Sequence, residues 1–193
     1  GTIYRLQAKY DLAETAFTRA LSISEKLFGP QHQEVGMLLV DLADVFIAQR
    51  EVQKAQRYCE RARPILENSL RPDHPARGLM FNALGLIRRS QGRLDEAAEL
   101  FAQALRIFET AQGSEHLDIA PALINLAAIK YDQRNYAEAE TLLRRSIAIH
   151  EKVLGARHPG SVSALQAYAE VLRKMKRKQE AKAVEHQVKA LWP

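Results

Sequence analysis

Residues 149–159 read IHEKVLGARHP, and this stretch decides the fold because its pattern recurs along the chain. Residues 23–32 read ISEKLFGPQH, and their final residue, His32, begins a series in which His74, His116 and His158 follow at intervals of 42 residues. Four other series keep this interval: Glu25, Glu67, Glu109 and Glu151; Gln7, Gln49, Gln91 and Gln133; Ala13, Ala55, Ala97, Ala139 and Ala181; and Gly29, Gly113 and Gly155, with Arg71 in the missing place. A fixed period of this length indicates an array of structural repeats.

Each series has an explanation in a helical repeat. The glycines follow Phe28, Gln112 and Leu154, where the end of a helix favours a left-handed residue without a Cβ atom. Pro75 and Pro159 follow two of the histidines and suit the first turn of a new helix. The alanines are small because two helices approach closely there. Each period therefore predicts a first helix, a tight turn, a longer second helix and a linker. Residues 136–154 give the clearest second helix, about 29 Å long.

The residue pattern within a period distinguishes among the known repeats. HEAT and armadillo arrays and propeller blades have similar periods, but strand signals are absent from the sequence, which excludes the propeller. The run Leu39-x2-Leu42-Ala43-x2-Phe46, followed by Ala55-x3-Cys59, matches the tetratricopeptide pattern. We therefore expect an all-α fold, a right-handed α-α superhelix of antiparallel helix pairs known as the tetratricopeptide (TPR) solenoid.

The long linkers resemble one kind of TPR in particular. Residues 149–159 are similar to the linker of the kinesin light chain-like repeat, and so are residues 23–32. The first helices keep at most one asparagine each where that family tends to have two. The ending, residues 168–174, looks more like the terminal repeat of bacterial proteins, so the resemblance implies a bacterial-type array.

The register divides residues 1–193 into a single array. Residues 1–31 form a truncated first repeat, residues 32–73, 74–115 and 116–157 form full repeats, and residues 158–193 form the last. Because the chain opens inside a first helix and lacks an initial methionine, we expect it to be a fragment of a longer protein. Residues 1–5 lack the pattern of a signal peptide, and no apolar run reaches the roughly 20 residues that a transmembrane helix needs. A single cysteine, Cys59, fits a reducing compartment, so we expect a cytoplasmic protein.

The TPR resemblance implies a peptide-binding groove along the first helices, which line the concave face of such an array. The candidate groove residues are Met37, Val40, Asp44, Ile47, Asn82, Leu86, Arg89, Ile124, Asn125, Tyr131, Gln166 and Arg173. Their apolar floor and scattered amides suit an extended or helical peptide, and Arg89 or Arg173 would meet an acidic side chain. For Asn82 and Asn125, a cap or a local hydrogen bond is the alternative.

Other residues favour structural roles. The four histidines of the series belong to different repeats, so they lie too far apart to bind one zinc ion together. We expect them to be linker residues. Cys59 takes a buried aromatic position, and His150 and His186 look like surface or boundary residues. We expect the basic run 173–178 to be solvated surface. The alternative is that this run binds an acidic protein or a membrane surface. Without interleaved aromatic residues it does not favour nucleic acid.

The sequence therefore predicts a non-catalytic scaffold that binds a protein or peptide, with no cofactor, metal or small-molecule substrate. One alternative is a self-associating module, because the apolar side of residues 13–28 and the pair Leu191 and Trp192 would be exposed at the ends of the array. Another is a regulatory arm of a larger signalling protein or enzyme.

Overall fold

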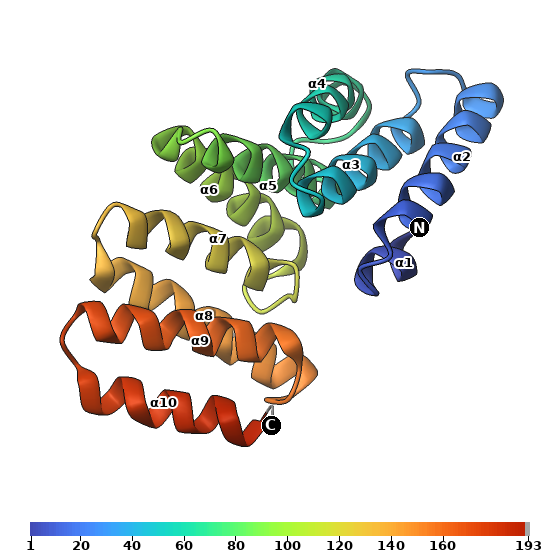
Figure 1. Ribbon diagram of the computed structural model, residues 1–193. Helices are drawn as coiled ribbons and strands as arrows, with labels where there is room; N and C mark the ends of the chain where they lie inside the picture. The colour runs from blue at the N-terminus through green and yellow to red at the C-terminus, as the bar shows by residue number, and fades with distance from the viewer. Residues whose placement is uncertain (192–193) are drawn as a thin grey trace. The chain divides into compact units, whose positions relative to one another are not determined.

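The computed structural model describes residues 1–191, apart from the side chain of Leu6, and Trp192 therefore lies outside the described residues. This part of the chain forms ten helices and no strand (Figure 1). The helices are α1 (Thr2–Leu6), α2 (Tyr10–Phe28), α3 (Gln33–Ala48), α4 (Val52–Ser69), α5 (Pro75–Ser90), α6 (Leu94–Gln112), α7 (Ile119–Asp132), α8 (Tyr136–Leu154), α9 (Pro159–Lys174) and α10 (Lys178–Leu191). The predicted all-α fold of paired helices is confirmed.

The helix ends follow the 42-residue register. Helices α2, α6 and α8 end at Phe28, Gln112 and Leu154, as the glycine series predicts. The glycine that follows each of them has φ between +82° and +85°, which a residue with a Cβ atom rarely adopts. Helix α4 instead ends at Ser69, and Leu70 after it is extended, because this linker has Arg71 in place of the glycine.

The histidine series caps the first helices. The Nδ1 atoms of His32, His74 and His158 accept hydrogen bonds from the backbone N–H two residues further on, at 3.1–3.2 Å. In the remaining linker, between α6 and α7, the Nδ1 atom of His116 accepts from the N–H of Asp118 at 3.3 Å, one residue before α7. The bonds of His32, His74 and His158 each satisfy an amide that the first turn of a helix leaves without a partner, whereas the bond of His116 lies just outside α7. The predicted linker role is confirmed, and its physical basis is helix capping.

The chain divides into two compact units, residues 1–107 and 108–193, with the boundary inside α6. In the first unit, α3 packs against α2, α4 and α5, which explains why this helix is apolar almost all round. Its buried residues include Leu39, Leu42 and Phe46. The repeats continue in register across the boundary in the sequence, so the single array stays a prediction.

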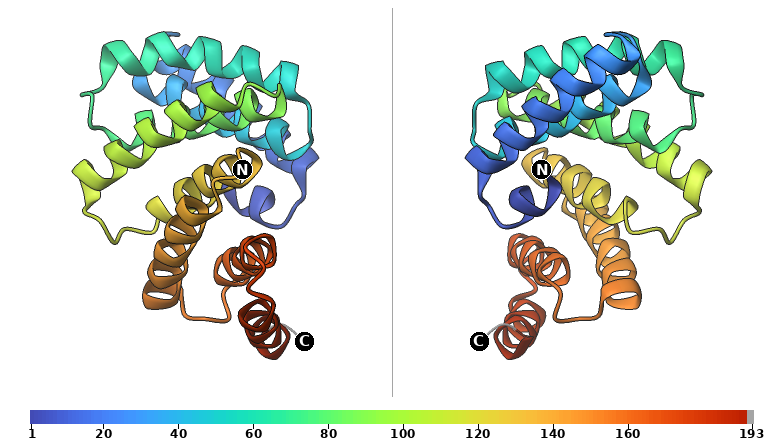
Figure 2. Two further views of the ribbon diagram at one scale, coloured as in Figure 1. Left: turned by 90° about the vertical axis from the view of Figure 1, so that its left-hand side faces the viewer. Right: turned by 90° about the vertical axis from the view of Figure 1, so that its right-hand side faces the viewer.

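In the second unit, α9 closes a core that α7 and α8 leave open. Ala127, Ala139 and Leu143 of the α7–α8 pair lie in one buried cluster with Tyr168 and Leu172 of α9. Figure 2 shows α9 and α10 side by side, nearly end on. Within residues 1–191, no helix combines the length and the apolar character needed to cross a membrane.

Candidate functional site

The first helices of the first unit, α3 and α5, carry the first seven groove candidates. Met37, Asp44 and Ile47 of α3 and Asn82, Leu86 and Arg89 of α5 are all partly exposed. Val40 is an exception, because only 5% of it is exposed and it belongs to the core. Its placement in the groove was wrong, since the packing of α3 on three neighbouring helices buries this position.

A large apolar side chain stands beside these residues on α5. Leu79 is 46% exposed, one helical turn before Asn82. Exposed apolar side chains mark an interaction surface where they form a contiguous patch, whereas a single one is common on protein surfaces. Asn82 and Arg89 are both engaged in interactions within the protein.

The same unit has two partly buried acidic residues on α3, Asp41 and Asp44. Burial raises the pKa of Asp44 to about 6, and neighbouring Asp41 raises it further, whereas Arg5 lowers it. The Oδ2 atom of Asp44 lies 3.9 Å from Nη1 of Arg5. Burial also raises the pKa of Asp41. This end of α3 therefore favours a positive group beside it, which the sequence analysis did not predict.

In the second unit the candidates differ in exposure. Ile124 and Tyr131 of α7 pack partly against the core cluster. The Tyr131 ring contacts Tyr136 edge to face, and Nζ of Lys174 lies 5.9 Å from its centroid. Asn125 is partly exposed and engaged in interactions within the protein. Only part of the predicted α7 surface is therefore open to a ligand.

The α9 candidates line a hollow. Gln166 and Arg173 are exposed, and together with Glu170 they form one wall of a hollow of about 560 Å³. Helix α10 supplies the opposite wall with Glu185, Val188 and Lys189. Arg173 forms an ion pair with Glu185 across it. The structure thus brings Gln166 and Arg173 together in a concave site.

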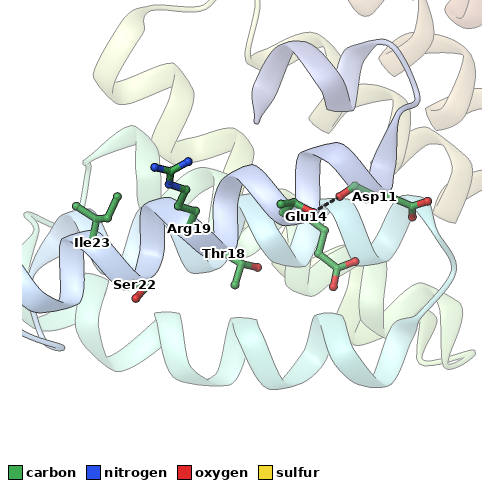
Figure 3. A pocket seen from close by; sticks show the side chains of 7 residues that line it. Asp11, Glu14, Thr18, Arg19, Ser22 and Ile23 are labelled. Atoms are coloured by element: carbon green, nitrogen blue, oxygen red, sulfur yellow. Dashed lines mark hydrogen bonds between the residues drawn. The ribbon is translucent and has the colours of Figure 1, made fainter.

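Sequence reasoning missed a second hollow, of about 840 Å³, along α2. Figure 3 shows Glu14, Thr18 and Ser22 on one side of this helix and Arg19 and Ile23 on the other. The hydroxyl of Thr15 is occupied, because it donates to the carbonyl of Asp11 at 2.9 Å. The run of hydroxyl side chains on α2 was the only signal in the sequence.

Neither the cysteine nor the metal-binding residue types form a reactive site in the described part of the chain. Cys59 is fully buried, and burial raises its pKa to about 12, far from the reactive thiolate. In the described part of the chain, no three His, Cys, Asp or Glu residues gather as a metal site would require.

The expectation that His150 is a surface or boundary residue was wrong. His150 is buried, and its Nδ1 lies 3.1 Å from the carbonyl oxygen of Ser146. His186 is exposed, as expected. In the register, His150 takes the place of Leu66 and Phe108, two core residues, and that signal could have located it.

Comparison with known proteins supports the repeat class. The tetratricopeptide repeat family profile matches residues 1–51, 34–110 and 118–191. A search of curated proteins returned no match.

Solved structures share the fold. The nearly identical TPR-like repeats of a kinesin light chain-type protein from Podosopora anserina have 25% identity and a TM-score of 0.71 over 98% of this chain and 90% of that one. BtubC (BKLC) from P. vanneervenii has 18% identity and a TM-score of 0.78, covering 98% and 76%. The apo form of RapI has 15% identity and a TM-score of 0.71, covering 98% and 50%. The chain belongs to the tetratricopeptide repeat family and is of the kinesin light chain-like kind.

Proposed function

We propose that this chain is an interaction scaffold that binds a peptide segment of another protein along the first helices of its repeats. The observation that carries the proposal is Leu79, a large apolar side chain that stays half exposed on α5 among polar neighbours. Burying it would remove apolar surface from water and gain about 1.5–3 kcal/mol for a full side chain, roughly half of which remains available here.

Charge defines what such a segment would contain. Asp44, whose pKa burial raises, favours a Lys or Arg side chain beside α3. Arg89, further along α5, favours an acidic one. We therefore propose a segment that carries an apolar anchor for Leu79 between a basic and an acidic residue. On α9, Gln166 and Arg173 offer a second contact point for an acidic group.

Selection from a displayed library of random peptides tests this function. We expect binders with the stated charge pattern, and we expect the double variant Asn82→Ala/Arg89→Ala to weaken them at least about tenfold, since hot-spot residues typically contribute more than about 1 kcal/mol each. The matched control is Gln53→Ala/Arg57→Ala, two exposed residues of the second helix α4. Circular dichroism melts must show that both variants stay folded. Unchanged binding by the folded Asn82/Arg89 variant refutes the groove.

A second candidate function is self-association, which the exposed apolar side of α2 favours. Ile23, Leu27 and Phe28 all lie exposed there. Sedimentation velocity over a range of concentrations would show a dimer that Ile23→Glu/Leu27→Glu abolishes. A monomer at all concentrations would exclude this function.

A further inference from the structure

The hollow between α9 and α10 continues into a second one. The adjoining hollow, about 330 Å³, shares Arg173 and Glu185 with the first and is also lined by Lys178 and Lys182. Ala169 and Ala181 form the small apolar floor, one alanine in each hollow. We call the two together the α9–α10 hollow.

The residues one repeat earlier in the 42-residue register form a surface on which a helix packs. The positions equivalent to the floor are Ala127 and Ala139, and the position equivalent to Glu185 is Leu143. These three residues form the cluster on which α9 packs with Tyr168, Val171 and Leu172. The α9–α10 hollow therefore keeps the backbone and the alanine floor of a surface that receives a helix one repeat earlier.

The walls of the hollow are charged, whereas most of the equivalent positions one repeat earlier are apolar. Tyr131, Tyr136 and Ile147, which pack against the earlier cluster, are matched in register by Arg173, Lys178 and Lys189. Glu140 is matched by Lys182. The lining thus holds four basic residues against two acidic ones, Glu170 and Glu185. Among the described residues, Lys178, Lys182 and Lys189 form no ion pair, and all three are exposed.

We propose that the α9–α10 hollow binds an acidic amphipathic helix of a partner protein, seated as α9 is seated on α7 and α8. The alanine floor leaves room for an apolar ridge with the spacing i, i+3, i+4 of Tyr168, Val171 and Leu172. Glutamates flanking that ridge would face the three unpaired lysines. Packing a helix into an apolar-floored groove with charges at its rim is a common mode of recognition, in which the charges supply specificity.

This surface goes beyond the first-helix groove, although Gln166 and Arg173 contribute to both. The lysines on α10 belong to the hollow alone, and Asn82 and Arg89 belong to the groove alone. Variants of these two sets therefore separate the failure of one proposal from the failure of the other.

The probe is a fluorescein-labelled peptide of 16 residues, the length of α9. It keeps tyrosine, valine and leucine at the positions of Tyr168, Val171 and Leu172 and has alanine and glutamate elsewhere. A second peptide has lysine in place of every glutamate. Fluorescence anisotropy measures the binding of both peptides to the chain of residues 1–193.

We expect the glutamate peptide to bind and the lysine peptide not to bind. Lys178→Glu/Lys182→Glu/Lys189→Glu should weaken the glutamate peptide at least about tenfold, because three attractive pairs become repulsive. Raising the salt from about 0.05 M to about 0.5 M should weaken it as well, through screening of exposed charges. The charge-matched control Lys9→Glu/Lys26→Glu/Arg57→Glu in the first unit and the Asn82→Ala/Arg89→Ala variant should both bind as the unsubstituted chain does.

Three results would overturn the proposal. The glutamate peptide could fail to bind the folded chain, or it could bind the lysine-reversed variant equally well. Alternatively, oligothymidine or phosphatidylserine vesicles could bind more tightly than the peptide and lose binding in the same variant, which would assign the surface to another class of partner. Circular dichroism confirms that each variant is folded before it is compared.

Discussion

Replacing Gly85 by alanine tests the packing of the repeat, because two effects of opposite sign compete at this position. Gly85 lies inside α5, where alanine is favoured over glycine by about 0.8–1.0 kcal/mol. A Cβ atom at Gly85, however, would lie 2.6 Å from Cε1, 2.7 Å from Cδ1 and 2.9 Å from Cζ of Phe101. Phe101 is fully buried and cannot swing away into solvent.

Overpacking a tight core costs about 1–3 kcal/mol. Subtracting the gain in helix propensity leaves a net loss of up to about 2 kcal/mol for Gly85→Ala. Two other repeats have alanine at the position of Gly85 and a side chain smaller than phenylalanine at the position of Phe101. Ala43 is paired in register with Cys59, and Ala127 with Leu143. The first repeat has the same pairing as Gly85 and Phe101, because a Cβ atom at Gly1 would lie 2.5 Å from Cε1 of Phe17.

The assay is a double-mutant cycle measured by urea unfolding and followed by far-ultraviolet circular dichroism. In a Phe101→Leu background, Gly85→Ala should turn from destabilising to stabilising, by as much as about 1 kcal/mol. The coupling energy should then reach about 1–3 kcal/mol, the range for residues in contact. If Gly85→Ala stabilises the unsubstituted chain by the full helix-propensity gain, the close packing of Gly85 against Phe101 is refuted.

Three further predictions concern single side chains. Burial lowers the pKa of His150 from its ordinary value of 6.5, with His158 contributing, so the folded state binds the proton less readily than the unfolded chain. The unsubstituted chain should therefore lose stability relative to His150→Leu as the pH falls below about 6.5 in urea titrations, and parallel pH profiles would contradict this. His74→Ala should remove the cap of α5 and cost about 0.5–2 kcal/mol in the same assay, whereas His186→Ala on the exposed face of α10 should change stability by less than about 0.5 kcal/mol. Cys59, fully buried with its pKa raised to about 12, should react with a thiol reagent only as fast as the chain unfolds, and immediate stoichiometric labelling at neutral pH would disprove its burial.

The sequence predicts the helices well because their ends carry local signals. The glycines after Phe28, Gln112 and Leu154 and the histidines before the first helices each act within a few residues, so the 42-residue register is enough to find them. The alanine series is likewise buried as expected, from Ala13 to Ala181.

Surface assignments are less predictable because they depend on which neighbouring helix covers a residue. Val40 and His150 both became buried through contacts with other helices, which a single repeat does not encode. The pKa of Asp44 likewise depends on tertiary structure, since burial raises it and Arg5, a residue 39 positions away, lowers it. The α9–α10 hollow could have been suspected from the register alone, because Glu185 and Lys189 interrupt positions that are apolar one repeat earlier.

The most direct test of the first-helix groove is photo-crosslinking from two positions of matched exposure in the first unit. Leu79 on the first helix α5 is 46% exposed, and Ile23 on the second helix α2 is 48% exposed. Each is replaced in turn by p-benzoylphenylalanine, and a peptide selected by display is irradiated with each protein. Crosslinking from position 79 and its near absence from position 23 is the predicted result. Equal crosslinking from both positions, or crosslinking from position 23 alone, would contradict the proposal that the first helices bind the partner.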